Sequence, residues 1–431
     1  MRNWKQRLMA IFMTLAFCIL LVQPVTVRAA DDDRIQCGDN VYATLNMGVL
    51  TISGSGDMWD ASDYAWEHYF YDIGNLIYQV VITDGVTSIG DRAFYSWSSG
   101  YYAIFKNLQK VSIGKSVREI GESAFEYSPG LFSIDIPGNV QTIGRYAFNN
   151  TNLKTCTLHP GLKLIGARAF GYTDLTGISI PDDISTIGEN AFLGSSLSSV
   201  TIPKNIGLIM SGAFGDVSAT IYSSEVIIGA GAFGRGSTLT ADRGSTAEEF
   251  AKNYGISLKY FQYPSKVSFN ANGGSVSKKS KQVLSEATYG ALPKPTRKGY
   301  EFVGWYTKKQ GGSLVKADTL VTSKNDSVLY AHWKKVSVKT ASKPTLKNIK
   351  TRKVTVKIKK VSGASGYQIR YSLKSNMKSS KTATTTSTTK TLTNLKKGKT
   401  YYVQVRAYKK DSKGNRVYGS WSSKQKVKVT K

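Results

Sequence analysis

A six-residue pattern of apolar and small residues occurs seven times between Ile89 and Phe233. Each copy begins with isoleucine, usually followed by glycine, and ends with alanine and phenylalanine. The copies begin at Ile89, Ile120, Ile143, Ile165, Ile187, Ile209 and Ile228. A fixed period of about 20 to 50 residues is typical of a solenoid, in which each coil buries its apolar face only against its neighbours. The pattern therefore predicts stacked coils.

A second apolar position lies twelve residues before each phenylalanine, although the spacing between copies varies. Apolar and polar residues alternate around it, as in residues 175–180 and 197–202. Alternation with period two indicates a half-buried strand. We expect these strands to form a parallel ladder along one side of the coil. The Gly-x-x-Ala-Phe half should form a short helical or 3₁₀ turn, with glycine supplying a positive φ.

Coil stacking would place the phenylalanine rings in one column, which is the expected structural core. Its members are Phe94, Phe125, Phe148, Phe170, Phe192, Phe214 and Phe233. These repeats resemble the BspA-like leucine-rich repeats of bacterial surface proteins, from residue 76 to 243. The resemblance implies a solenoid at 76–262 that includes a C-terminal cap, and an N-terminal cap at 31–75. A capping box at Ser245 and Glu248 supports the C-terminal cap.

The first 30 residues have the features of a signal peptide. Three basic residues precede an apolar run from Leu8 to Val22, and small residues at 29 and 30 offer a cleavage site. No later run approaches the roughly 18 apolar residues of a transmembrane helix. We therefore expect an exported protein without a transmembrane segment in the mature chain, secreted or held non-covalently at the cell surface.

Two further modules follow the repeats. Residues 263–334 contain a strand and tight turn at 267–274 and aromatic strands at 299–306 and 329–333, and resemble the internalin B-type (Listeria-Bacteroides) B-repeat. That resemblance implies a small β-rich, ubiquitin-like spacer or adhesion module. Residues 335–431 contain alternating strands and a tyrosine-corner pattern before Tyr401, and resemble a fibronectin type III domain.

The expected fold class is therefore a mainly β multidomain chain. It should comprise a leucine-rich repeat solenoid with short helical turns, a small β-rich ubiquitin-like module and a β-sandwich. Each stretch of the mature chain is assigned to one of these modules, so no segment of catalytic-domain size remains.

Charge is divided unevenly along the chain. Of the 58 basic and 29 acidic residues, 15 basic and 24 acidic lie in 31–262, whereas 12 and 4 lie in 263–334 and 27 and 1 in 335–431. A dense field of one sign favours a polyanionic partner such as an anionic wall polymer or a sulfated glycan. A lysine-rich surface can also serve solubility alone. Nucleic acid fits less well because the protein is exported and has no nucleic-acid module.

The lysines assigned to polyanion contact are spread over the last module. They are Lys353, Lys357, Lys359, Lys396, Lys397, Lys399, Lys409 and Lys410.

Two surfaces of the solenoid are candidate ligand contacts. An insertion near residues 95–106 holds Trp97, Tyr101 and Tyr102, and such loops either bind partners or fold back onto a cap. The outward strand positions form a column of Ser112, Asp135, Thr157, Ser179 and Thr201. Small hydroxyl side chains there are also explained by β-propensity alone.

Catalytic and metal chemistry find little support in the sequence. Cys156 occupies an inward strand position, so a free thiol is favoured over a disulfide framework. The three histidines lie in separate parts of the chain, and no Cys-x-x-Cys or Ser-His-Asp grouping can be proposed. We expect no cofactor and no metal.

Two interpretations of function remain. The first is a non-catalytic, adhesin-like binding protein that presents the solenoid on a lysine-rich β-domain stalk and binds a host or bacterial surface protein or glycan. The second treats these modules as accessories of an extracellular glycan-directed hydrolase. The carboxylates that such a hydrolase could use, for example Glu119 with Glu122 or Asp182 with Asp183, are expected in repeat loops without an evident cleft.

Overall fold

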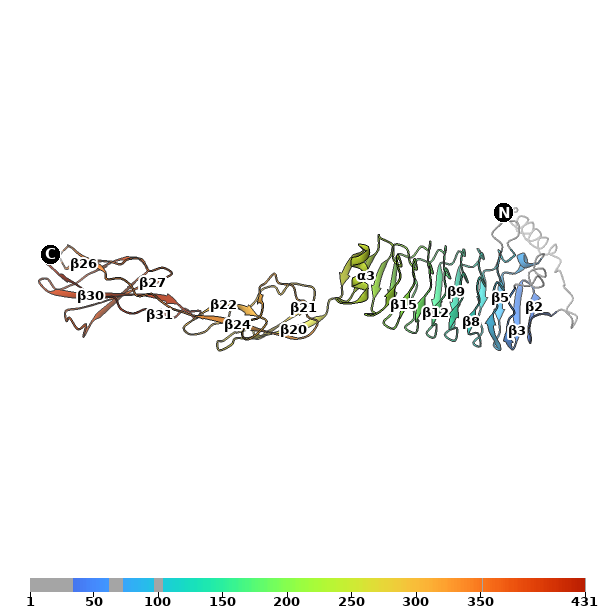
Figure 1. Cartoon of the computed structure of the whole chain (residues 1–431), viewed down its shortest axis with the longest axis horizontal. Coiled ribbons are helices and arrows are strands. Elements are labelled where there is room, and N and C mark those ends of the chain that lie inside the picture. The colour runs from blue at the N-terminus through green and yellow to red at the C-terminus, as the bar shows by residue number, and fades with distance from the viewer. Residues whose placement is uncertain (1–33, 62–72, 97–103, 351, 431) are drawn as a thin grey trace, which may run out of the picture. The chain divides into compact units, whose positions relative to one another are not determined.

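The structure is a computed structural model that describes residues 34–61, 73–96, 104–350 and 352–430. It divides into two compact units, Met1–Tyr260 and Phe261–Lys431. The expected signal peptide and the residues Trp97, Tyr101 and Tyr102 lie outside the described residues. Strands dominate both units (Figure 1), so the expectation of a mainly β multidomain chain is confirmed.

An eight-stranded parallel sheet runs the length of the first unit. Neighbouring strands are in register, so that Ile143 pairs with Ile120 on one side and Ile165 on the other. In chain order its strands are β4 (Gly56–Asp57), β6 (Val86–Ile89), β8 (Glu119–Ile120), β10 (Thr142–Ile143), β12 (Leu164–Ile165), β13 (Thr186–Ile187), β15 (Leu208–Ile209) and β17 (Ile227–Ile228). This ladder was not predicted from the sequence, because seven of its eight strands have only two residues and are too short to show alternation.

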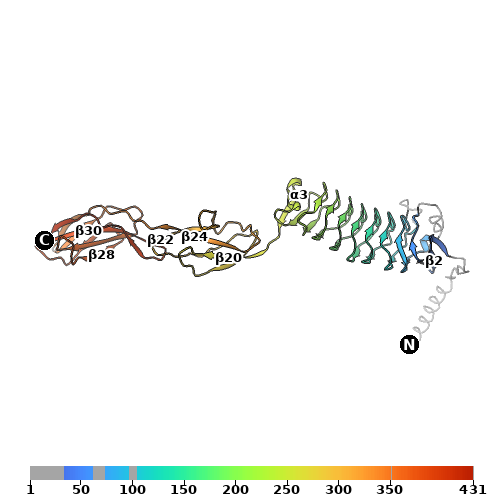
Figure 2. The same ribbon diagram turned by 60° about the horizontal axis from the view of Figure 1, so that its bottom comes forward.

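The longer, predicted strands form three sheets rather than one continuous ladder. Figure 2 shows the successive coils of the first unit stacked one after another. The ladder is interrupted at the coil that contains Gly177, which forms only an isolated bridge between Ser179 and Thr201. Glycine weakens a strand. The first sheet contains β1 (Ile35–Gly38), β2 (Val41–Asn46), β3 (Val49–Gly54), β5 (Gln79–Ile82) and β7 (Lys110–Ser112). The others contain β9 (Ser133–Ile136) with β11 (Thr155–Leu158), and β14 (Ser199–Ile202), β16 (Ser218–Ile221), β18 (Thr238–Ala241) and β19 (Ser257–Tyr260).

The Gly-x-x-Ala-Phe segments, expected to form short helical or 3₁₀ turns, are turns with i→i+3 hydrogen bonds, such as that from the N–H of Ala169 to the carbonyl of Gly166 at 3.2 Å. The N–H of Phe170 donates to the carbonyl of Ala191 in the next coil at 2.8 Å. The positive φ falls on Arg168, at 52°, and not on Gly166. A Cβ on Gly166 would lie 2.6 Å from the carbonyl carbon of Gly144 in the previous coil. Glycine is therefore required for close approach of two backbones, not for its freedom in φ.

The seven phenylalanine rings stack in one column inside the coils. Neighbouring ring centroids are 5.2 to 5.4 Å apart, and the planes differ by 3° to 15°. Phe105 closes one end of the column edge-on at 5.6 Å, and Phe250 closes the other at 6.1 Å. All seven rings are buried, so each coil is fixed to both of its neighbours by ring contacts as well as by backbone hydrogen bonds.

A helix, α3 (Thr246–Tyr254), caps the last coils. The hydroxyl of Ser245 accepts a hydrogen bond from the N–H of Glu248, and Gly255 ends the helix in the left-handed conformation. The buried Glu248 carboxylate accepts hydrogen bonds from Lys252 at 2.7 Å, from Tyr260 at 2.5 Å and from the N–H of Gly244. These bonds lower the pKa of Glu248 to about 2, so this carboxylate remains charged well into acid.

The second unit begins with a five-stranded mixed sheet. Its strands are β20 (Pro264–Asn270), β21 (Ser280–Leu284), β22 (Tyr300–Tyr306), β23 (Leu314–Val315) and β24 (Ser327–Lys335), in the order β21-β20-β24-β22-β23. The central pair, β20 and β24, is parallel. Trp305, only 2% exposed, fills the core and donates to the carbonyl of Pro293 at 2.8 Å. Residues 285–299, between β21 and β22, form no helix.

The last module is a sandwich of two antiparallel sheets. One contains β25 (Thr345–Lys350), β26 (Lys353–Lys357) and β29 (Thr389–Leu392). The other contains β27 (Gly366–Ser372), β28 (Lys381–Thr385), β30 (Thr400–Lys410), β31 (Arg416–Tyr418) and β32 (Gln425–Lys428). The hydroxyl of Tyr401 accepts a hydrogen bond from the N–H of Lys396 at 3.1 Å, which is the tyrosine corner that the sequence predicts.

A turn at residues 411–415 joins this sandwich to the preceding sheet module. Asp411 is only 6% exposed and accepts hydrogen bonds from the N–H groups of Gly299, Lys413 and Asn415 at 2.8 to 2.9 Å. The hydroxyl of Ser412 also bonds to the backbone of Arg297. Asp411 is the one acidic residue in 335–431, and its carboxylate is committed to this joint.

Candidate functional site

Two neighbouring pairs of the predicted column of outward strand positions lie side by side in the solenoid. Asp135 is paired with Thr157, and Ser179 is bridged to Thr201. Asp135, Thr157, Ser179 and Thr201 are exposed, and Ser112 is half-buried. Four of the five side chains are exposed and polar, so the column is suited to surface contact with a ligand.

Two features of this face were not predicted from the sequence. The carboxylate of Asp135 is hydrogen-bonded to Nε2 of His159 at 2.8 Å. Phe132, which is 48% exposed, precedes the strand and lies 5.7 Å from the ammonium group of Lys154. Because an exposed aromatic ring beside mixed charges is common in binding surfaces, Phe132 and Lys154 extend the candidate contact surface to the edge of β9 and β11.

The eight lysines proposed for polyanion contact do not form one cluster. Lys353 and Lys357 lie on β26, and Lys359 follows it. Lys396, Lys397 and Lys399 lie in the β29–β30 connection, whereas Lys409 and Lys410 end β30. Seven of the eight are exposed, and Lys409 is half-buried. The structure therefore distributes them over both ends of the sandwich and one of its sheets.

The structure adds three lysines to one of these groups. Lys374, Lys378 and Lys381 line a cavity together with Lys396. They belong to the β27–β28 connection and the start of β28, and Lys396 belongs to the β29–β30 connection. No local sequence pattern links the two connections, so only the fold shows that they share a cavity.

Two arginines on the sandwich sheet that contains β27 and β30 are held in place by neighbouring side chains. Arg370 and Arg406 both lie 4.4 Å from the ring of Trp421. Arg370 also donates to Gln404 at 2.7 and 3.0 Å, and Arg406 donates to Gln368 at 2.8 Å. These arginines stack on the indole, which makes them part of the sheet's packing rather than freely moving charges.

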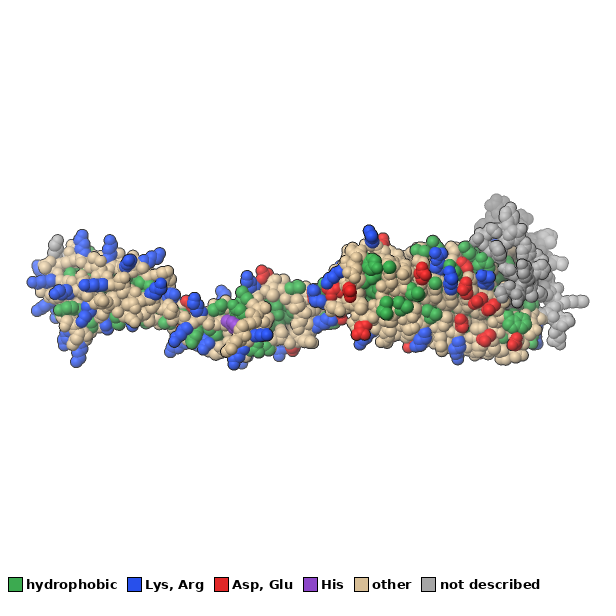
Figure 3. Space-filling view, in the orientation of Figure 1, with side chains coloured by type: hydrophobic (Ala, Val, Ile, Leu, Met, Phe, Trp, Pro, Cys, Tyr) green, Lys and Arg blue, Asp and Glu red, His purple; other side chains and the backbone are tan. Residues whose placement is uncertain are grey.

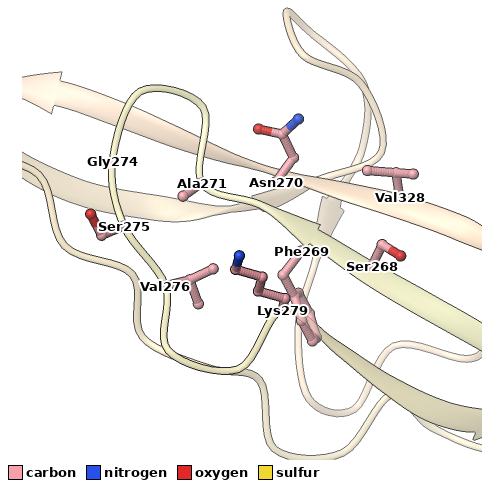
Figure 4. Close-up of a pocket in the computed structure, with 9 residues that line it drawn as sticks. All are labelled: Ser268, Phe269, Asn270, Ala271, Gly274, Ser275, Val276, Lys279 and Val328. Carbon is pink, nitrogen blue, oxygen red and sulfur yellow. The ribbon is translucent and has the colours of Figure 1, made fainter.

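A pocket of about 530 Å³ lies beside β20 in the sheet module. Figure 4 shows the Lys279 side chain beside Phe269 and Val276, with Ser268, Asn270 and Ser275 around them. Lys279 is the one titratable side chain among the nine lining residues. A pocket with a single lysine and no carboxylate or histidine lacks an acid–base pair for hydrolysis.

The described part of the chain has no reactive thiol and no cluster of metal ligands. Cys37 and Cys156 are free, and burial raises the pKa of Cys37 to about 12 and raises that of Cys156 as well. Their thiols are therefore poor nucleophiles at neutral pH. Within the described ranges no three His, Cys, Asp or Glu side chains are grouped to hold a metal ion. Nor does any helix described there have the length and apolar character to span a membrane.

Family comparisons agree with the three modules. Residues 98–221 match the BspA type leucine rich repeat region in six copies, residues 266–332 match the Listeria-Bacteroides repeat domain, and residues 339–419 match the fibronectin type III domain. The three resemblances inferred from the sequence are thus confirmed. Modules of these kinds are typically non-catalytic binding modules, which indicates a binding or adhesin-like role.

Similar solved structures include several bacterial leucine-rich repeat proteins. A leucine-rich repeat protein from Eubacterium ventriosum is 21% identical, with 49% of this chain and 67% of that chain covered and a TM-score of 0.31. A leucine rich cell surface protein from Faecalibacterium prausnitzii is 18% identical, with 54% and 96% covered and a TM-score of 0.27. The T. pallidum leucine rich repeat protein is 15% identical, with 50% and 94% covered and a TM-score of 0.26. A search of curated proteins finds no match.

Proposed function

We propose that this protein is a secreted, non-catalytic adhesin-like protein of bacterial cell surfaces. Its C-terminal modules hold the protein to an anionic surface polymer, and its solenoid contacts a partner protein or glycan through the strand face around Asp135 and Phe132. The signal peptide features of residues 1–30 support export.

The distribution of charge is the observation that carries this proposal. Residues 263–431 have 39 basic and 5 acidic residues, a net charge of +34, whereas residues 31–262 have a net charge of −9. Lys and Arg side chains predominate on the C-terminal modules in Figure 3, and Asp and Glu are frequent on the solenoid. Because Asp411 is buried in the joint, no exposed carboxylate of the last module can neutralise its lysines.

The test is a binding series of the intact mature chain on immobilised wall teichoic acid, with immobilised dextran as the uncharged control. We expect retention on the anionic polymer alone, and an affinity that falls steeply between about 0.05 and 0.5 M salt because exposed charges are screened. Binding that does not change with salt, or equal binding to dextran, would contradict the proposal.

A further inference from the structure

A cavity of about 590 Å³ opens at one end of the C-terminal sandwich. One wall is the β27–β28 connection, residues 373–380, and the other is the β29–β30 connection, residues 393–399. Its volume is within the roughly 300 to 1,000 Å³ of small-molecule sites. The lining residues are Tyr371, Ser372, Leu373, Lys374, Lys378, Ser379, Lys381, Thr393, Asn394, Leu395, Lys396 and Tyr401.

Hydrogen bonds hold the first wall in place. The hydroxyl of Ser372 donates to the carbonyl of Lys378 at 2.8 Å and accepts from the N–H of Lys374 at 3.1 Å. The ammonium group of Lys424 donates to the carbonyl of Ser375 at 2.9 Å. Met377 is buried beneath the connection. The wall is thus formed before any ligand arrives, which lowers the entropy cost of binding.

The second wall is fixed independently of the first. Its Lys396 N–H donates to the hydroxyl of Tyr401 at 3.1 Å, and the carbonyl of Leu395 accepts from the guanidinium of Arg352 at 3.0 Å. The rings of Tyr401 and Tyr371 lie behind this wall with centroids 6.2 Å apart. Backbone groups of the two walls make these bonds, so the side-chain ammonium groups of the lining lysines are not needed to keep the cavity open.

Four lysines surround the cavity without a carboxylate to balance them. Lys374, Lys378, Lys381 and Lys396 are all exposed, and no acidic residue lies among the lining residues. The joint holds Asp411, the one carboxylate of the module. A recess with several unbalanced positive charges favours an anionic ligand, since recessed sites focus the electrostatic field.

The uncharged lining residues narrow the chemical class of the ligand further. Hydroxyl and amide groups of Ser379, Thr393 and Asn394 can exchange hydrogen bonds with hydroxyls of a ligand. Leu373, which is 42% exposed, offers an apolar contact beside them. A sugar ring that carries sulfate or carboxylate groups combines these three properties: negative charge, several hydroxyls and an apolar ring face.

We propose that this cavity binds a single anionic sugar unit of an acidic polysaccharide, with its sulfate or carboxylate groups held by Lys374, Lys378, Lys381 and Lys396. The proposal rests on the proposed function and names a discrete site within the basic surface. It distinguishes recognition of one sugar unit from attraction by the lysine field as a whole.

The test compares two variants that lose the same charge. One replaces the cavity lysines (K374Q, K378Q, K381Q and K396Q), and the other replaces lysines at the opposite end of the sandwich (K359Q, K360Q, K410Q and K413Q). Titration calorimetry measures binding of a heparin tetrasaccharide to the intact mature chain. We expect roughly tenfold or greater loss of affinity in the first variant and less than about threefold in the second, because only the first removes direct charge-assisted hydrogen bonds.

A third variant, Leu373→Ala, keeps every charge and should weaken binding about threefold through lost apolar contact. Equal losses of affinity in the two lysine variants would show that the cavity is not the binding site. They would leave the proposed polyanion-binding function in place. Absence of tetrasaccharide binding to the unaltered chain, together with failure on teichoic acid, would overturn both. Binding of poly(glycerol phosphate) or inorganic phosphate as tight as the tetrasaccharide would overturn the assignment to a sugar.

Discussion

Replacement of Phe170 by alanine is expected to destabilise the solenoid by about 3 to 5 kcal/mol, the usual effect of removing a fully buried phenylalanine. The Phe170 ring is 0% exposed and stacks on Phe148 and Phe192 at 5.4 Å. Removal of the ring leaves a gap in the centre of the column. Because each coil contacts only its neighbours, we expect the stack to lose cooperativity at this point.

Cysteine labelling in increasing urea measures this effect in the intact chain. Of the described residues only Cys37 and Cys156 carry thiols, and both lie in the solenoid unit. Mass spectrometry of labelled peptides follows Cys156, which belongs to the same coil as Phe170. The control is Phe132→Ala, which removes a half-exposed ring and should cost less than about 1 kcal/mol. Equal shifts of the urea midpoint in both variants would contradict the structural role of the column.

Replacement of Gly166 by alanine is expected to destabilise the solenoid by roughly 1 to 3 kcal/mol, although the substitution adds only a methyl group. The new Cβ would lie 2.6 Å from the carbonyl carbon of Gly144 and 2.7 Å from the backbone nitrogen of Arg145. Backbone atoms of a neighbouring coil cannot rotate away as a side chain can. The two coils must therefore separate, which strains the hydrogen bond from Gly166 to Ile143.

Gly177 provides the matched control for this substitution. A Cβ on Gly177 meets no heavy atom within 4 Å, and its φ is outside the left-handed region. Gly177→Ala should leave stability unchanged or raise it slightly, since alanine restricts the unfolded chain. The same cysteine labelling measures both variants. A Gly166→Ala chain as stable as the Gly177→Ala chain would show that the coils are not packed as closely as described.

Large, strictly spaced side chains made the solenoid predictable from sequence. The phenylalanines recur with a fixed partner twelve residues earlier, and only stacked coils bury both. The ladder through Ile120, Ile143 and Ile165 was not predictable in this way, because each strand is two residues long. The role of Gly166 was assigned wrongly, since a sequence does not distinguish a glycine that needs positive φ from one that needs backbone contact.

The candidate surfaces were predicted only in part. The basic character of the last module follows directly from composition, and the strand column follows from alternation. The cavity did not follow from either, because Lys378 and Lys396 are separated in sequence and meet only through the strand order β28-β27-β30. Exposure of Phe132 beside Lys154 also depends on how neighbouring coils align. Local patterns therefore identified the modules, while the binding geometry required the fold.

The central claim is that the C-terminal module, and not the solenoid, binds the anionic polysaccharide. Hydrogen–deuterium exchange of the intact mature chain, with and without a heparin tetrasaccharide, tests this claim most directly. We expect slower exchange in residues 373–380 and 393–399 on binding, and unchanged exchange throughout 76–262. Protection within the solenoid, with none in the C-terminal module, would contradict it.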